Sequence, residues 1–240
     1  MKKILVVIPA YNEEKNIARV LDDVKKQDIL LDILVVNDGS KDNTVKIAQA
    51  HGALVLDLPT NLGIGGARQA GLIFAKENNY NLCVQMDADG QHPASNIRNL
   101  IEGINQREIV IGSRFIKNEY HGAITRRLGI ILLSGFLRLV TGKKITDPTS
   151  GLRAFCRPCI IFLAKYYPID YPEVEPLVFL YWAGFKIREI PAIMESRKAG
   201  KSSIAPFYYM IKVILSILIN IIREKPKWSW AQENEIIKKG

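Results

Sequence analysis

Hydrophobic and polar positions follow two alternating periods along the first half of the chain. Short apolar runs such as KILVVI predict buried strands, whereas Ile17, Val20, Leu21 and Val24 recur at helical spacing. The pattern predicts strands at residues 3–8, 32–36, 53–58 and 82–86, and helices at residues 12–26, 42–51 and 65–77. Strands that alternate with helices of this length indicate a parallel sheet with right-handed crossovers.

Polar residues follow three of the predicted strands. Residues 9–13 (PAYNE) come after the first strand, residues 37–40 (NDGS) after the second, and residues 87–89 (DAD) after the fourth. Ligands of parallel α/β sheets bind beyond the carboxyl ends of the strands. We therefore expect these three segments to face one crevice.

The second half of the chain is less regular. Its pattern predicts strands at residues 107–112 and 186–190, and helices at residues 125–140, near 158–165 and near 174–183. A further apolar segment, residues 207–222, contains Lys212 and runs into a stretch with basic residues and Trp. That combination favours a helix in a membrane interface over a core helix, and no segment reaches the roughly 20 apolar residues of a membrane span. We interpret the chain as one catalytic domain with a membrane-facing C-terminal extension.

The basic composition of the chain indicates an anionic binding partner. The formal net charge is +9, and residues 114–144 hold seven basic residues against one acid. Nucleic acid, a membrane surface or a phosphorylated substrate would suit such a charge. Three cysteines make no disulfide framework, the lone Cys156–Cys159 pair cannot complete a zinc site, and the start of the chain does not resemble a secretory leader. We expect ordinary thiols in a reducing cytosol.

Asp87 and Asp89 place two negative charges two residues apart at a strand end. Like charges this close repel, so a cation, an arginine or solvent should accompany them. Mg²⁺ and Mn²⁺ take oxygen ligands, commonly one or two carboxylates completed by substrate phosphates. With Gln91 nearby, the pair predicts a divalent metal site that a diphosphate would complete.

Two other segments have a structural and a functional interpretation. Residues 63–68 (GIGGAR) open a helix, and Arg68 is a candidate anion ligand, although glycines also serve helix starts without any ligand. Asp38 is placed to bind a nucleotide's ribose or base, but Asn37, Asp38 or Ser40 would equally cap the next helix.

An ordered series of motifs resembles family 2 glycosyltransferases. The series runs PAYNEE, VVNDGSKDNT, NLGIGGARQAG, QMDADGQHP, IGSR, DPTSGLRAF and RKAGKSS, over roughly residues 3–204. It is most similar to polyprenyl-phosphate sugar transferases of the dolichyl-phosphate mannose synthase type. The resemblance implies a GT-A fold, an α/β domain with a Rossmann-like, mostly parallel sheet flanked by helices. We expect this domain at residues 1–204, with a nucleotide-sugar half (1–112), an acceptor half (113–204) and an amphipathic membrane-associating helix with a basic tail (205–240).

The resemblance also implies roles for individual residues. It assigns the nucleotide sugar to Pro9, Tyr11, Glu13 and Asp38, the divalent metal to Asp87, Asp89 and Gln91, and the acceptor phosphate to Arg114, Arg127 and Ser134. Arg197, Lys201 and Ser202 would close over the donor diphosphate, which Arg68 and Asp87 would also contact. The candidate catalytic residues are Asp89, Arg114, Arg197 and Asp147, the last of which is equally suited to capping a turn.

Two departures from the family pattern qualify these roles. Relatives often have two acids where this chain has Asn37 and Asp38, which would alter base or ribose contacts. Many relatives also carry C-terminal transmembrane helices, whereas residues 205–240 contain no convincing one. Recruitment by a small integral-membrane protein is therefore a natural hypothesis.

The expected reaction is inverting, metal-dependent transfer of a hexose from a nucleotide-diphosphate sugar to undecaprenyl or dolichyl phosphate, at the cytoplasmic face of the cell membrane. An acceptor phosphate is already anionic and needs positioning more than a general base. The alternative is a family 2 transferase that extends a cell-surface glycan through a sugar hydroxyl. A nucleotidyltransferase would need a Gly-rich basic loop where PAYNEE stands, and no nucleic-acid-binding motif accompanies the basic residues.

Overall fold

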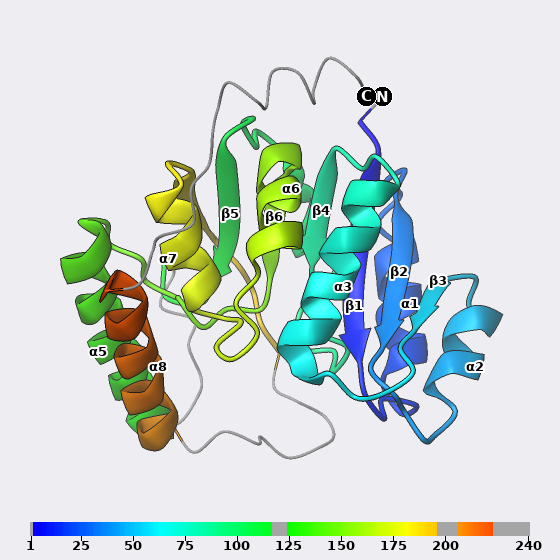
Figure 1. Cartoon of the computed structure of the whole chain (residues 1–240). Helices are drawn as coiled ribbons and strands as arrows, with labels where there is room; N and C mark the ends of the chain where they lie inside the picture. The colour runs from blue at the N-terminus through cyan, green and yellow to red at the C-terminus, as the bar shows by residue number, and fades with distance from the viewer. Residues whose placement is uncertain (1, 117–123, 196–205, 223–240) are drawn as a thin grey trace.

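Figure 1 shows the computed structural model, which describes residues 2–116, 124–195 and 206–222. Seven strands form one sheet in the order β3-β2-β1-β4-β6-β5-β7. The strands are β1 (Ile4–Ala10), β2 (Asp32–Asn37), β3 (Leu54–Asp57), β4 (Leu82–Gln85), β5 (Glu108–Ser113), β6 (Arg153–Cys156) and β7 (Lys186–Pro191). The helices are α1 (Ile17–Lys25), α2 (Thr44–Ala50), α3 (Gly63–Glu77), α4 (Asn96–Ile101), α5 (Ile124–Thr141), α6 (Arg157–Tyr166), α7 (Glu175–Trp182) and α8 (Pro206–Ile222).

The central strands are buried on both faces, which their unbroken apolar runs predict. β1 pairs in parallel with β2 and with β4, and every residue from Leu5 to Ala10 is buried. Helices α3 and α6 lie over one face of the sheet, in front of it in Figure 1, while α1 lies behind β1 and β2. The predicted mostly parallel sheet flanked by helices is confirmed.

Strand β6 is the one antiparallel element among the described strands. It runs against β4 on one side and against β5 on the other, while β5 and β7 are parallel. Because β6 is reversed, its first residue, Arg153, lies at the edge where β4 and β5 end. The hydrophobic pattern predicted neither β6 nor α4, which are only four and six residues long.

Glycines allow two close approaches in this core. A Cβ atom on Gly71 of α3 would lie 2.3 Å from Cγ1 of Val7. One on Gly65, in the first turn of the same helix, would lie 2.2 Å from the carbonyl oxygen of Ile169. The glycines of the GIGGARQAG segment therefore let α3 lie directly on β1 and on the 169 loop.

Helices α5 and α8 lie side by side at one margin of the fold, beyond α7 (Figure 1). Among the described residues, no helix is both long and apolar enough to cross a membrane. A buried carboxylate attaches α8 to α7: Glu175 is 2% exposed and accepts hydrogen bonds from Ser216 and, at 2.9 Å, from Nδ2 of Asn220. Burial raises the pKa of Glu175 above its ordinary value.

The raised pKa of Glu175 makes stability depend on pH. A carboxylate whose pKa is higher in the folded than in the unfolded state stabilises the fold below the unfolded pKa, and that contribution is lost as pH rises through the folded pKa. Glu175→Gln retains an oxygen for Ser216 and Asn220 without the buried charge. We expect the variant to gain stability relative to wild type as pH rises above about 4.3.

Urea unfolding of both proteins across that pH range measures the difference. Glu102→Gln, at the exposed end of α4, is the matched control and should follow wild type at every pH. A Glu175→Gln variant that is less stable than wild type at neutral pH would show that the charge itself holds α8.

Candidate active site

A cavity of about 450 Å³ opens at the carboxyl ends of β1, β2 and β4. Residues from the three predicted polar segments line it, together with the start of α3 and one residue that precedes α7. The lining residues are Pro9, Ala10, Tyr11, Glu13, Asp38, Asn61, Gly63, Ile64, Ala67, Arg68, Asp87, Ala88, Asp89 and Glu173. The segments therefore meet at one place, as the strand order requires.

Hydrogen bonds between two loops build one wall of the cavity. The backbone N–H of Asn12 donates to Oγ of Ser40 at 2.9 Å, and Oδ1 of Asn12 accepts from the N–H of Lys41 at 2.8 Å. Asn12 has a φ of 55°, a left-handed conformation that Asn tolerates better than most residues. This frame leaves the ring of Tyr11 half-exposed at the cavity wall.

Asp38 and Asn37 face different partners. Asp38 lines the cavity, and its Oδ1 accepts the N–H of Leu62 at 2.7 Å, just before α3. Asn37 is not among the lining residues: its Nδ2 donates to Oδ1 of Asp57 on β3 at 2.6 Å, and its Oδ1 accepts the N–H of Ser40 at 3.2 Å. The amide of Asn37 therefore joins β2 to β3.

Arg68 supplies a positive charge beside the Asp87 carboxylate. The guanidinium is 3% exposed; its Nη2 lies 3.0 Å from Oδ1 of Asp87, and its Nη1 lies 3.2 Å from Oε1 of Glu173. Burial would lower the pKa of Arg68, but the two carboxylates raise it above its ordinary value, so the side chain stays charged. Its Nε atom is buried without a hydrogen-bond partner.

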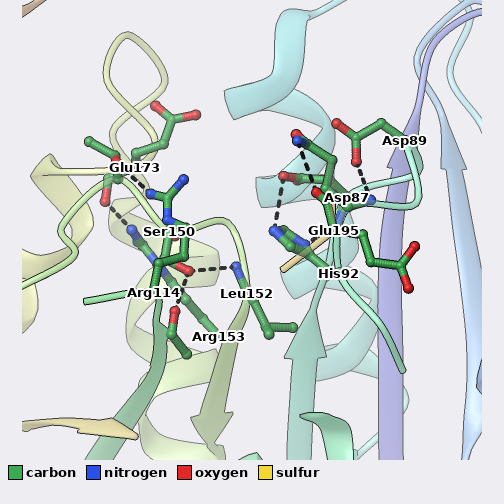
Figure 2. A network of polar contacts seen from close by, with 12 residues as sticks. Asp87, Asp89, His92, Arg114, Ser150, Leu152, Arg153, Glu173 and Glu195 are labelled. Atoms are coloured by element: carbon green, nitrogen blue, oxygen red, sulfur yellow. Dashed lines mark hydrogen bonds and ion pairs between the residues drawn. The ribbon is translucent and has the colours of Figure 1, made fainter. Parts of the chain in front are cut away.

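Asp87 is held from several sides. Burial alone would raise the pKa of Asp87, but the Arg68 pair outweighs it and keeps the pKa below the ordinary value. The N–H of Asp87 donates to Nδ1 of His92 at 3.2 Å, and burial lowers the pKa of His92, which leaves the ring neutral (Figure 2). A Cβ on Gly151 would lie only 2.5 Å from Oδ2 of Asp87, so a side chain at this position would displace the Asp87 carboxylate.

Asp89 lies in the tight turn that follows Asp87. It is buried, and its Oδ1 accepts the N–H of Gln91 at 3.0 Å. The Gln91 side chain turns towards Glu195, the last residue of the described range 124–195, and its Nε2 donates to the carbonyl of Glu195 at 3.5 Å. Arg197, Lys201 and Ser202, which the sequence assigns to the donor diphosphate, lie outside the described residues.

The donor set fits a hard divalent cation in chemical type. Asp87 and Asp89 both line the cavity, and carboxylate oxygens are the ligands that Mg²⁺ and Mn²⁺ prefer. The described residues hold no cluster of three or more His, Cys, Asp or Glu side chains that could bind a metal ion on its own. Two carboxylates are thus an incomplete site, which matches an ion that shares its coordination with a substrate.

A second buried ion pair lies beside the first. Asp147 is fully buried; its Oδ2 accepts from Nε of Arg114 at 2.6 Å and its Oδ1 from Nη2 at 2.5 Å. The backbone N–H groups of Thr146 and Asp147 donate to Glu189 of β7 at 2.7 and 2.8 Å, and burial raises the pKa of that carboxyl. The fork of Arg114 is therefore fixed by Asp147, which has no surface open to a substrate.

The other two expected phosphate ligands are placed differently from Arg114. Arg127 is exposed on α5, and the hydroxyl of Ser134 donates to the carbonyl of Ile145. Like Arg114, neither residue is among those that line the cavity.

Several residues of the site were not assigned to it from the sequence. Asn61 and Ile64 line the cavity at the start of α3. Arg153 is buried at the start of β6, where its Nε donates to the carbonyl of Ser150 at 2.9 Å and its Nη2 donates to the carbonyl of Glu173 (Figure 2). Burial lowers the pKa of Arg153 to about 10. The SGLR sequence, which places Arg153 just before a short apolar run, was the sequence signal that could have indicated a buried arginine at a strand start.

The family model described as "Glycosyl transferase family 2" matches residues 5–162, which include the β1, β2 and β4 segments and the whole cavity except Glu173. The chain belongs to glycosyltransferase family 2. It is therefore an enzyme of the glycosyltransferase class.

Curated members of the family cover nearly the whole chain. The UDP-N-acetylglucosamine–dolichyl-phosphate N-acetylglucosaminyltransferase of Methanococcus voltae is 36% identical over 79% of this chain and 84% of its own. The undecaprenyl-phosphate mannosyltransferase of Micrococcus luteus is 32% identical over 85% of this chain and 88% of its own. These relatives are named for sugar transfer to polyprenyl phosphates.

Solved structures with the GT-A fold are similar to the whole described fold of this chain. Glucosyl-3-phosphoglycerate synthase from Mycobacterium tuberculosis, in complex with Mn²⁺, UDP and glucosyl-3-phosphoglycerate, superposes with a TM-score of 0.69 at 22% identity. The match covers 90% of this chain and 79% of that one. A complex of the same enzyme with Mg²⁺ and UDP has a TM-score of 0.66 at 24% identity and covers 83% of this chain and 73% of that one. At these identities the likeness establishes the fold.

Removing Arg68 should destabilise the protein as well as the site. Arg68→Ala leaves Asp87 and Glu173 facing each other without the cation between them. Since both carboxylates are partly exposed, we expect a loss of roughly 1–3 kcal/mol in the free energy of unfolding. Arg68→Lys should recover little, because an ammonium lacks the planar fork that contacts both carboxylates. Urea denaturation measures both variants.

Arg98→Ala is the matched control for this prediction. Arg98 is exposed on α4 and donates from Nη2 to the carbonyl of Gln27 at 3.2 Å. Its removal should change stability by less than about 0.5 kcal/mol. Equal effects of Arg68→Ala and Arg98→Ala would contradict the bridging role of Arg68.

Proposed function

We propose that this chain transfers a sugar from a nucleotide-diphosphate sugar to a polyprenyl phosphate, with inversion, in a reaction that depends on Mg²⁺ or Mn²⁺. One observation carries the proposal: Asp87, Asp89 and Arg68 lie together in a cavity at the carboxyl ends of parallel strands. Such a cavity can hold a nucleoside diphosphate and a cation. The polyprenyl-phosphate acceptor is inferred from the curated relatives.

The nucleotide sugar would occupy the 450 Å³ cavity. Pro9, Tyr11, Glu13 and Asp38 form the wall at the ends of β1 and β2, where a base and ribose would lie. Arg68, in the floor beside Asp87, adds positive potential towards the diphosphate. The sugar and the base are not specified by this lining.

Asp87 and Asp89, with Gln91 in the same turn, would hold the metal ion. Solved GT-A neighbours were crystallised with Mn²⁺ or Mg²⁺ and UDP, which supports this use of the carboxylates. When bound, the ion neutralises charge on the leaving diphosphate. The contact of its backbone N–H with the neutral His92 and the ion pair with Arg68 keep Asp87 oriented and ionised.

The acceptor phosphate would be bound by Arg114, with Arg127 and Ser134 as further candidates. A guanidinium suits phosphate because of its planar set of donors, and a phosphate oxygen that is already anionic needs no general base. Asp147 is a better positioning residue than a base, since it is fully buried and paired with Arg114. Arg197, Lys201 and Ser202 would close over the donor and exclude water, as the family pattern implies.

The proposed division of labour follows the chain. Residues 1–112 would bind the nucleotide sugar, residues 113–204 the acceptor, and residues 205–240 would associate with the membrane. The enzyme would then work at the cytoplasmic face of the cell membrane, where polyprenyl phosphate and nucleotide sugars meet. A small integral-membrane partner could supply further anchoring.

A transfer assay tests the proposal. Purified protein with Mg²⁺ or Mn²⁺, detergent and undecaprenyl phosphate is offered a panel of UDP- and GDP-sugars. We expect lipid-linked sugar with one donor class, and a loss of at least about 100-fold in Asp89→Asn, since a metal-bound carboxylate is removed. Asp28→Asn is the control, because Asp28 is exposed and remote, and its φ of 48° suits Asn.

The outcomes separate the alternatives. If product forms with oligosaccharide acceptors but not with polyprenyl phosphate, the acceptor is a sugar hydroxyl and not the lipid phosphate. Full activity after chelation of divalent ions would remove the metal from the proposal. No binding of any nucleotide sugar would overturn it altogether.

Gly151→Ala tests whether Asp87 is a metal ligand. The added Cβ would displace the Asp87 carboxylate, so we expect Mn²⁺ affinity in the presence of UDP or GDP to fall about tenfold, as for other changes beside metal ligands. Isothermal titration measures the affinity. Gly129→Ala is the control, since a Cβ there would meet no atom within 4 Å. Unchanged Mn²⁺ affinity in a folded Gly151→Ala protein would exclude Asp87 from the metal site.

A further inference from the structure

Helices α5 and α8 each bury one stripe of side chains. Ile130, Leu133 and Leu137 of α5 are at most 3% exposed, and Val213 and Ile217 of α8 at most 1%. Both helices pack against α7 and against each other. Their buried stripes therefore face the same side, and their opposite sides face away from the domain.

The outward sides of both helices are also apolar. On α5, Leu128, Ile131 and Leu132 are 54–59% exposed and Leu139 is 86% exposed. Nine of the eighteen exposed large hydrophobic side chains in the described part of the chain lie on these two helices. Helices that are apolar all round are normally buried on every side, and an exposed patch of this kind marks an interaction surface.

The charge of the two helices is of one sign. Neither sequence, residues 124–145 or 206–222, contains an acidic residue. Arg127, Arg138, Lys143 and Lys144 are exposed on α5 and the turn that follows it, and Lys212 is exposed on α8. Apolar side chains beside basic ones fit a surface with an apolar interior and anionic head groups.

We propose that the outward sides of α5 and α8 together dock on an anionic lipid bilayer. Hereafter they are called the α5–α8 face, represented by Leu128, Ile131, Leu132, Leu139, Leu215 and Ile219. The membrane contact then includes α5, a helix within the proposed acceptor half, in addition to the C-terminal segment. A second copy of the chain fits less well, because a symmetric contact would bring the two basic surfaces together.

Glu175 makes the α5–α8 face part of the folded domain. Its carboxylate accepts from Ser216 and Asn220, on the inner side of α8, and so holds this helix on α7. The face is therefore built before any lipid arrives. It serves the proposed lipid acceptor, but the lipid contact itself does not require sugar transfer.

Vesicle co-sedimentation of the full chain tests the proposal. The vesicles contain phosphatidylglycerol and phosphatidylcholine but no polyprenyl phosphate, so the result is independent of the proposed reaction. Leu139→Glu alters α5 and Ile219→Glu alters α8, both at exposed positions. We expect each to weaken binding at least about tenfold, because a side chain that enters the bilayer is replaced by a charged one. Binding to pure phosphatidylcholine should also be weaker.

Leu30→Glu is the matched control, because Leu30 is 78% exposed and lies between α1 and β2, outside the α5–α8 face. This variant should bind vesicles as wild type does. Loss with Ile219→Glu alone would remove α5 from the face and overturn the proposal. So would a wild-type protein that does not bind vesicles. A wild-type dimer by light scattering that both variants convert to monomer would assign the face to a second copy instead.

Discussion

The architecture of the site depends on one buried guanidinium that neutralises carboxylates from two distant parts of the chain. Arg68 starts from α3, contacts Asp87 after β4 and contacts Glu173 before α7. Without it, the two acids would repel each other at the cavity floor, and burial would raise the pKa of Asp87. With it, Asp87 stays ionised at neutral pH, and residues from the first and second halves of the chain are joined by ion pairs. The ion pairs thus stabilise the fold, and they also keep the Asp87 carboxylate charged and in place at the cavity.

The reversed strand β6 explains how the second half reaches this position. Parallel strands would all deliver their carboxyl ends to the cavity, but β6 delivers its amino end, with Gly151 and Arg153. Gly151 lets the backbone lie against the Asp87 carboxylate, and Arg153 binds the carbonyls of Pro148, Ser150 and Glu173. The buried side chain of Arg153 therefore holds the loop that contains Glu173 in place. The antiparallel strand therefore brings residues from the second half of the chain to the sheet edge where β4 and β5 end.

Periodicity was sufficient to predict the parallel part of the sheet, because its strands are long apolar runs separated by regular helices. It was insufficient for β6, whose four residues begin with an arginine and whose direction is set by its pairing with β4 and β5. The cavity segments were predictable from topology, since the carboxyl ends of neighbouring strands must meet. The partner of Asp87 was not, because nothing local links Arg68 or Glu173 to a strand end. Asn37 shows the converse: a residue in a binding motif whose amide serves the neighbouring strand.

Among the described residues, two acids separated by one residue occur twice, at 87–89 and at 173–175. Asp87 and Glu173 both pair with Arg68, while Asp89 turns to the cavity edge and Glu175 holds α8. Contacts run without interruption from Ser216 and Asn220 through residues 173–175 to Arg68 and Asp87. A transferase that joins a water-soluble donor to a lipid must keep its donor cavity at a defined position relative to the bilayer. The ion pairs of Arg68 and the hydrogen bonds of Glu175 join the cavity floor, residues 173–175 and α8 in one framework. Under the proposed function, this framework would supply the fixed geometry, because the cavity floor and α8 share the short segment that carries both acids.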